Sequence, residues 1–232
     1  MRTLYHLWLS PFCRKVRIVL TEKGVEYEMR TENLFQRRPE FLALNPACEV
    51  PVLVDDIGNG DGDGEDRALV IPDSGAICEY LEEIAAEPPL LAGTPADRAE
   101  IRRLVAWFDH KFNAEVTINL VGEKIMKRFL QRGAPDSRAI RAGKRNIHTH
   151  LEYIGYLTER RTWLAGDNLS LADIAAAAHL STVDYLGDVP WEEHAAAKDW
   201  YARIKSRPSF RPILADHLPG EPPPRHYADL DF

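Results

Sequence analysis

The feature that most constrains the fold of this 232-residue chain is a change of pattern near residue 87. Before it, short apolar runs typical of strands alternate with helical segments, and after it every segment has helical spacing. The EPPLLAG stretch between the two halves has the composition of a linker. We therefore predict an α/β domain over residues 1–86, a linker over 87–93, an all-helical domain over 94–218 and a proline-rich acidic tail over 219–232.

The first domain is expected to follow the order β-α-β-α-β-β-α. The expected strands cover residues 3–8, 25–30, 50–54 and 69–72, and the expected helices cover residues 12–23, 41–45 and 74–84. Gly24 closes the first helix from the position just after its C-cap. Asn59-Gly60, inside the acidic segment 55–66, has the chemistry of a tight hairpin turn between the last two strands.

Two capping boxes mark helix starts in the second domain. Thr94 pairs with Asp97 in the first box, and Ser170 pairs with Asp173 in the second. The segment that follows the second box, DIAAAAHLSTVDYL, is rich in alanine and apolar over most of its surface. It is expected to be the central buried helix of the domain.

Composition narrows the class of protein. A net charge of −7 argues against non-specific binding to nucleic acid, because phosphate contacts need a basic face. The first residues lack the pattern of an export signal and no apolar run is long enough to cross a bilayer, so we expect a cytoplasmic protein without membrane insertion. Cys13, Cys48 and Cys78 have neither zinc-type nor CxxC spacing, so neither a disulfide framework nor a metal site is expected.

The charge is unevenly distributed, because the segment 124–145 is basic in an otherwise acidic chain. One interpretation is a docking face for an acidic partner, with Lys124, Lys127 and Arg128 among its contacts. The other interpretation is an ordinary solvated helix surface.

Cys13 is the strongest candidate for a chemically reactive residue. It follows a short apolar strand in Ser10-Pro11-Phe12-Cys13, at the start of the first helix. Backbone N–H groups and the helix dipole at such a position lower the pKa of a thiol and favour the thiolate. The alternative is that Cys13 is a small buried apolar residue. If Cys13 is not the catalytic group, Ser10 is the hydroxyl best placed to replace it.

Three motifs resemble those of the glutathione S-transferase superfamily. They are SPFCRKV at residues 10–16, NPACEVPVL at 45–53 and DSGAICEYL at 73–81. The resemblance covers about residues 1–215 and implies a thioredoxin-like domain followed by a helical bundle. It also implies a homodimer and a glutathione site.

The resemblance implies a role for each residue of that site. Val50 would pair its backbone with glutathione beside a cis Pro51, as an added strand would. Ser74 would hold the γ-glutamyl carboxylate and Asp73 the amino group. Cys13 would lie near the glutathione sulfur, which suits a mixed disulfide. The enzymatic interpretation is therefore a cysteine-type glutathione S-transferase or a glutathione-dependent thiol-disulfide reductase.

Two residues depart from the family pattern in the loop before Pro51. Cys48 stands where the family commonly has glycine, and Glu49 stands where it often has a basic residue. An anionic ligand would meet a negative charge there, and the acidic segment 55–66 adds to it. These departures favour a protein that does not use glutathione.

The tail carries a narrower resemblance. Three segments together are similar to those of a bacterial division protein in the superfamily. They are the tail end PPPRHYADLDF, the SPFCRK turn and the QRRPE stretch at residues 36–40. That division protein binds filaments of the tubulin-like GTPase FtsZ. This resemblance implies a non-enzymatic, cofactor-free homodimeric scaffold at the division site. A transcription-associated member, similar to stringent starvation protein A, is a further alternative.

The tail residues are candidate partner contacts, unless they dock on the chain's own surface. The candidates in the tail are Arg225, His226, Tyr227, Asp229, Leu230, Asp231 and Phe232.

Overall fold

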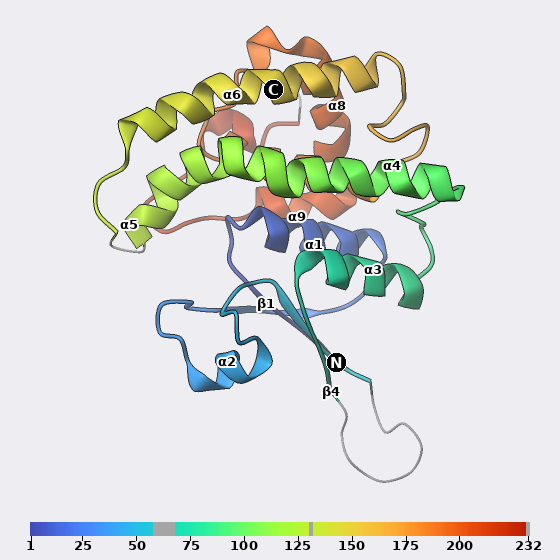
Figure 1. The fold of residues 1–232 in the computed structure, drawn as a ribbon, viewed down its shortest axis with the longest axis vertical. Helices are drawn as coiled ribbons and strands as arrows, with labels where there is room; N and C mark the ends of the chain where they lie inside the picture. The colour runs from blue at the N-terminus through green and yellow to red at the C-terminus, as the bar shows by residue number, and fades with distance from the viewer. Residues whose placement is uncertain (58–67, 130–131, 231–232) are drawn as a thin grey trace. The chain divides into compact units, whose positions relative to one another are not determined.

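The structure is a computed structural model that describes residues 1–57, 68–129 and 132–230. The chain divides into two compact units, residues 1–88 and residues 89–232 (Figure 1). The first unit is α/β and the second is helical, which confirms the predicted fold class.

The first unit contains a four-stranded mixed sheet. Its elements are β1 (Arg2–His6), α1 (Pro11–Glu22), β2 (Glu28–Thr31), α2 (Pro39–Leu44), β3 (Val52–Asp56), β4 (Ala68–Pro72) and α3 (Ser74–Ile84). The strand order is β2-β1-β3-β4, with β1 parallel to β2 and antiparallel to β3, and β3 antiparallel to β4. Helices α1 and α3 lie on one face of this sheet and α2 lies on the other (Figure 1).

The core of this unit forms where strands and helices meet. Leu4 on β1 pairs with Leu53 on β3, and both side chains are fully buried, as is Val16 on α1. A smaller cluster joins Phe41 of α2 to Cys48 and Val52. These contacts fix α2 and the loop that follows it against the sheet.

The second strand starts later than predicted. Gly24 has φ 62° and ends α1, as expected of a C′ glycine, and the Val25 N–H then donates to the Leu20 carbonyl at 2.9 Å. This bond holds Val25 in the turn that closes the helix, so β2 begins only at Glu28. The Asn59-Gly60 turn predicted between β3 and β4 lies outside the described residues.

The second unit is built from helices. Its elements are α4 (Pro95–Ala106), the π-helical η1 (Trp107–Met126), α5 (Lys127–Phe129), α6 (Ser137–Thr158), α7 (Leu171–Asp184), η2 (Trp191–Glu193), α8 (Ala195–Lys205), η3 (Pro208–Phe210), α9 (Arg211–Leu214) and η4 (Arg225–Tyr227). The elements from α4 to α5 form one long rod, and α6 packs alongside it (Figure 1).

Helix α7 is the centre of the second unit, because every one of its residues is buried. Both predicted capping boxes are present, at Thr94 with Asp97 and at Ser170 with Asp173. The Asp173 carboxylate is itself buried and accepts hydrogen bonds from the N–H groups of Leu164 (2.8 Å) and Ser170 (3.0 Å) and from the indole of Trp200 (3.0 Å). Burial raises the pKa of Asp173.

The tail returns to the helical unit. Tyr227 is fully buried, its hydroxyl donates to the Ile213 carbonyl at 3.1 Å, and its ring meets that of Tyr185 edge to face at a centroid distance of 5.1 Å. The Tyr185 hydroxyl donates to the Glu221 carbonyl at 2.8 Å. Of the two alternatives left open by the sequence, Tyr227 takes the intramolecular one, whereas Arg225, Asp229 and Leu230 are exposed.

The described residues offer neither a membrane-spanning helix nor a metal cluster. No helix among them is long and apolar enough to span a membrane. Within the same residues, no group of three or more His, Cys, Asp or Glu side chains is arranged to hold a metal ion.

Candidate functional site

The Cys13 thiol is buried at the start of α1. Ser10 is the N-cap of this helix, and its hydroxyl oxygen accepts a hydrogen bond from the Cys13 N–H at 3.3 Å. The thiol sulfur accepts one from the Leu7 N–H at 3.5 Å, and Cys13 is 0% exposed.

Burial raises the pKa of the Cys13 thiol to about 11, although the hydrogen bonds from Ser10 and Leu7 and the charge of Arg17 act in the opposite direction. The expectation of a lowered pKa was wrong, because removing the thiolate from water costs more than the helix start contributes.

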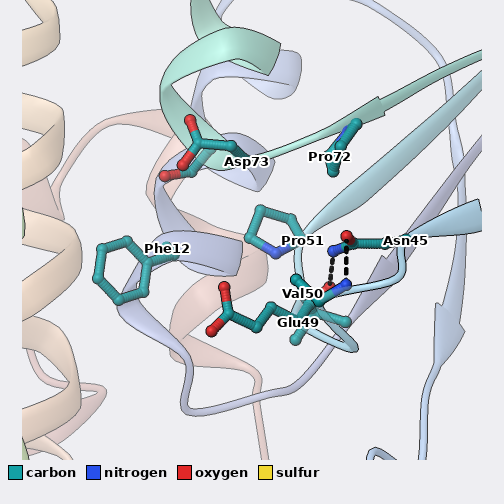
Figure 2. Close-up of a pocket in the computed structure, with 9 residues that line it drawn as sticks. Phe12, Asn45, Glu49, Val50, Pro51, Pro72 and Asp73 are labelled. Carbon is teal, nitrogen blue, oxygen red and sulfur yellow. Dashed lines mark hydrogen bonds between the residues drawn. The ribbon is translucent and has the colours of Figure 1, made fainter. Parts of the chain in front are cut away.

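A cavity of about 290 Å³ lies beside this helix start. Phe12, Val50, Pro51, Asp73 and Ser74 are among the residues that line it, together with Asn45 and Glu49 (Figure 2). Cys13 and Ser10 are not among them. The structure therefore brings together four of the residues predicted for a glutathione site and places the Phe12 ring, in place of the thiol, at the cavity.

The loop before β3 forms one wall of the cavity. The Asn45 side chain secures this loop, because its amide donates to the Glu49 carbonyl at 3.0 Å and its oxygen accepts from the Ala47 N–H at 3.1 Å (Figure 2). The Val50–Pro51 peptide bond is cis, as the family resemblance implies. Cys48 has φ 56°, a conformation that favours glycine and agrees with the family's usual residue at that position.

The start of α3 forms the opposite wall. Asp73 is the N-cap, and one of its carboxylate oxygens, Oδ1, accepts from the N–H groups of Gly75 (2.7 Å) and Ala76 (3.0 Å). Asp73 rather than Ser74 therefore caps this helix. Ser74 is only 3% exposed, and its hydroxyl makes no hydrogen bond within the described part of the chain.

The cavity is acidic. Glu49 and Asp73 are both exposed, and neither forms an ion pair with another described residue. None of the described lining residues is basic. The site therefore attracts cations and repels carboxylates, which agrees with the departure from the family pattern at Glu49.

The predicted basic contacts are engaged within the chain. Lys124 pairs with Asp188 at 2.5 Å, Lys127 pairs with Glu123 at 2.5 Å, and Arg128 pairs with Glu221 of the tail. These ion pairs reduce the positive charge that the three residues offer to a partner.

The basic segment 124–145, one interpretation of which is a docking face, also contains three arginines of α6. Arg138, Arg141 and Arg145 are exposed, lie on one helix face through their i, i+3 and i+7 spacing, and form no ion pair with any described residue. We call these three residues the arginine stripe.

The predicted tail contacts have different environments. Arg225 is exposed, whereas His226 lies with Nε2 3.3 Å from Asp184 Oδ1 and Tyr227 is buried in the helical unit. Asp229 and Leu230 are exposed. Asp231 and Phe232 lie outside the described residues.

The fold and the site define a class of protein. Residues 4–89 match the N-terminal domain of glutathione S-transferases, and residues 127–208 match their C-terminal domain. This chain belongs to the glutathione S-transferase family.

Three matches, one to a sequence and two to solved structures, cover the whole chain. FtsZ-localized protein A of Caulobacter vibrioides is 51% identical over 231 residues, which cover 100% of this chain and 98% of that protein. The solved structure of FzlA from C. crescentus, also 51% identical, has a TM-score of 0.93 and covers 100% of this chain and 99% of its own. A solved glutathione S-transferase from Rhodospirillum rubrum F11 is 59% identical, with a TM-score of 0.92 and full coverage of both chains.

Proposed function

We propose that this chain is an interaction protein of the glutathione S-transferase family that binds FtsZ filaments at the division site and does not use glutathione as a substrate. The single observation that carries the proposal is the 51% identity, over its whole length, to a protein named for its localization with FtsZ. Identity of this extent includes surface positions as well as the core, so a shared partner is a reasonable inference.

The chemistry of the first unit supports the non-enzymatic part of the proposal. A thiol with a pKa of about 11 is almost entirely protonated at neutral pH, and the thiolate is the nucleophile. The cavity next to it carries two exposed carboxylates and no described basic lining residue, so an anionic tripeptide is bound unfavourably there.

Two surfaces of the second unit are candidates for the filament contact. The arginine stripe offers three guanidinium groups to an acidic surface. The tail offers Arg225, Asp229 and Leu230, whose neighbours His226 and Tyr227 hold it on the helical unit. We infer a homodimer, as the family resemblance implies, since two copies of each surface would bridge filaments by avidity.

Co-sedimentation with FtsZ polymer tests the proposal. The wild-type chain is expected in the pellet with polymer and in the supernatant without it. Reversing the arginine stripe (Arg138→Glu, Arg141→Glu, Arg145→Glu) is expected to weaken pelleting at least tenfold, because three attractive charges become repulsive. Arg211→Glu is the matched control, since Arg211 is an exposed arginine of the same unit on α9.

The tail is tested by truncation after Ala228. This truncation removes residues 229–232, of which Asp229 and Leu230 are exposed, and leaves the anchor Tyr227 in place. A longer truncation that also removes residues 221–228 loses that anchor, so its failure to pellet would report instability as well as lost contact. Retention of the wild-type chain in the supernatant at saturating polymer contradicts the proposal.

A glutathione-dependent enzyme is the second candidate. It is favoured by the arrangement of Val50, cis Pro51 and Ser74 at the cavity and by the 59% identity to a solved glutathione S-transferase. Calorimetric titration with millimolar glutathione tests it. Binding, together with turnover that Ser10→Ala or Cys13→Ala abolishes, would establish the enzyme.

A further inference from the structure

We infer that the cavity between Phe12, Glu49 and Asp73 is a binding site for an arginine side chain presented by a protein partner. This inference goes beyond the proposed function, because it assigns a ligand to a cavity that filament binding through the second unit leaves unused. It stands on the shape, the charge and the polar atoms of the cavity.

The size of the cavity suits one side chain. Its volume, about 290 Å³, is at the lower end of small-molecule sites. Val50, Pro51 and Pro72 supply apolar lining surface, along which the methylenes of a long side chain can pack.

The charge of the cavity selects a cation. The carboxylates of Glu49 and Asp73 come from different segments, and Figure 2 shows both with the Phe12 ring around the same space. Asp73 uses Oδ1 to cap α3, which leaves Oδ2 as an acceptor for a ligand. The Lys15 ammonium lies 5.9 Å from the centroid of the Phe12 ring, but Lys15 is buried and does not line the cavity.

A polar group on a buried residue also points to a ligand. Ser74 lines the cavity, is 3% exposed, and its hydroxyl has no hydrogen-bond partner among the described residues. The Ser74 hydroxyl can therefore accept a hydrogen bond inside the cavity, and next to two carboxylates it is suited to an N–H donor from outside the chain.

Arginine fits these groups better than lysine does. A guanidinium presents five N–H donors in one plane, so it can bond to two carboxylates and a hydroxyl while its face rests on an aromatic ring. An ammonium has three donors around a single nitrogen and meets fewer of these acceptors at once.

The test is a titration of the full-length ¹⁵N-labelled chain followed by amide chemical shifts. The probe is Nα-acetyl-L-arginine amide. The N–H groups of Gly75 and Ala76, which donate to Asp73, are expected to shift with increasing probe and to shift less at high salt. The citrulline analogue, a neutral isostere, is the probe control, and it is expected to cause no shift.

Two variants test the assignment of the carboxylates. The double variant Glu49→Gln, Asp73→Asn is expected to weaken probe binding about tenfold or more, since both charge-assisted contacts are lost. Asparagine caps a helix as well as aspartate does, so the fold is retained. Glu83→Gln, a neutralised exposed glutamate on α3 outside the cavity, is the matched control and is expected to bind as the wild type does.

Three results would overturn the inference. They are equal shifts with the citrulline analogue, undiminished arginine binding by the double variant, and equal or tighter binding of the lysine analogue. Because the titration contains no FtsZ, its outcome is independent of the pelleting experiment.

Discussion

The starts of α3 and α7 both carry an aspartate, and the two aspartates have opposite environments. Asp73 at α3 is exposed, and only one of its carboxylate oxygens is hydrogen-bonded within the described chain. Asp173 at α7 is fully buried, and both of its oxygens accept hydrogen bonds, from Leu164, Ser170 and Trp200. The same residue type thus stabilises structure where it is buried and fully paired, and remains able to bind a ligand where it is exposed and half-paired.

Asp173→Ala should have the largest effect on stability. It leaves two backbone N–H groups and the Trp200 indole without an acceptor in the core, so the free energy of unfolding should fall by about 4 kcal/mol. Urea unfolding measures the change. Asp73→Ala is the matched substitution, and it should cost only about 1 kcal/mol, the usual value of an exposed cap.

Equal losses at the two positions would show that burial and full pairing do not make Asp173 more important for stability than Asp73. If Asp173→Ala fails to fold, Asp173→Asn should fold with a smaller loss and allow the same measurement, because the amide oxygen still accepts one of the hydrogen bonds.

Tyr227→Ala tests whether the tail is part of the fold. The substitution removes a buried ring and its hydrogen bond to Ile213, and we expect a loss of about 3 kcal/mol. Amide hydrogen exchange should show that residues 221–228 lose protection first. Leu230→Ala, at a side chain that is 38% exposed, should change stability by less than about 0.5 kcal/mol. Equal effects at the two positions would mean that the tail is not anchored through Tyr227.

The rate of alkylation of Cys13 tests whether the thiol is as unreactive as its burial implies. With its pKa raised from 9.0 to about 11, the thiolate fraction of Cys13 at neutral pH is about 100 times lower than that of a cysteine with the ordinary value. Reaction with iodoacetamide, followed by peptide mass spectrometry, should therefore be at least about 100 times slower in the folded chain than in urea. Rapid alkylation of folded Cys13 would restore it as a candidate nucleophile.

The smallest predicted effect is the pH dependence of the docking of the tail on the helical unit. Hydrogen bonding to Asp184 raises the pKa of His226 above its ordinary value of 6.5. The stabilisation from the protonated imidazole is therefore fully present below pH 6.5 and is lost as the pH rises through the higher folded-state pKa. Amide hydrogen exchange of residues 225–228, corrected for intrinsic rates, should become faster as the pH rises from 6.5 through the folded-state pKa of His226. His226→Gln should remove the dependence, and an unchanged profile in this variant would exclude His226 as its source.

Local chemistry made much of the fold predictable. The order of elements in the first unit followed from apolar spacing, and both capping boxes were evident from Ser or Thr three residues before Asp. Gly24 marked the end of α1 because its left-handed conformation is a local requirement. The family motifs identified the loop of Val50 and Pro51 and the helix start at Ser74.

Properties that depend on distant contacts were not predictable. The pKa of Cys13 was expected to fall because the sequence reveals a helix start, but it does not reveal the burial that dominates the pKa. The pairing of Lys124 and Arg128 needs Asp188 and Glu221, which lie far away in the chain. The docking of Tyr227 likewise depends on Ile213 and Tyr185.

We propose that this chain acts through its surfaces and not through glutathione chemistry. The most direct measurement is pelleting of the wild-type chain with FtsZ polymer, with and without millimolar glutathione. We predict saturable pelleting that glutathione leaves unchanged. A chain that stays in the supernatant with polymer, and that binds and turns over glutathione in the same preparation, would contradict the claim.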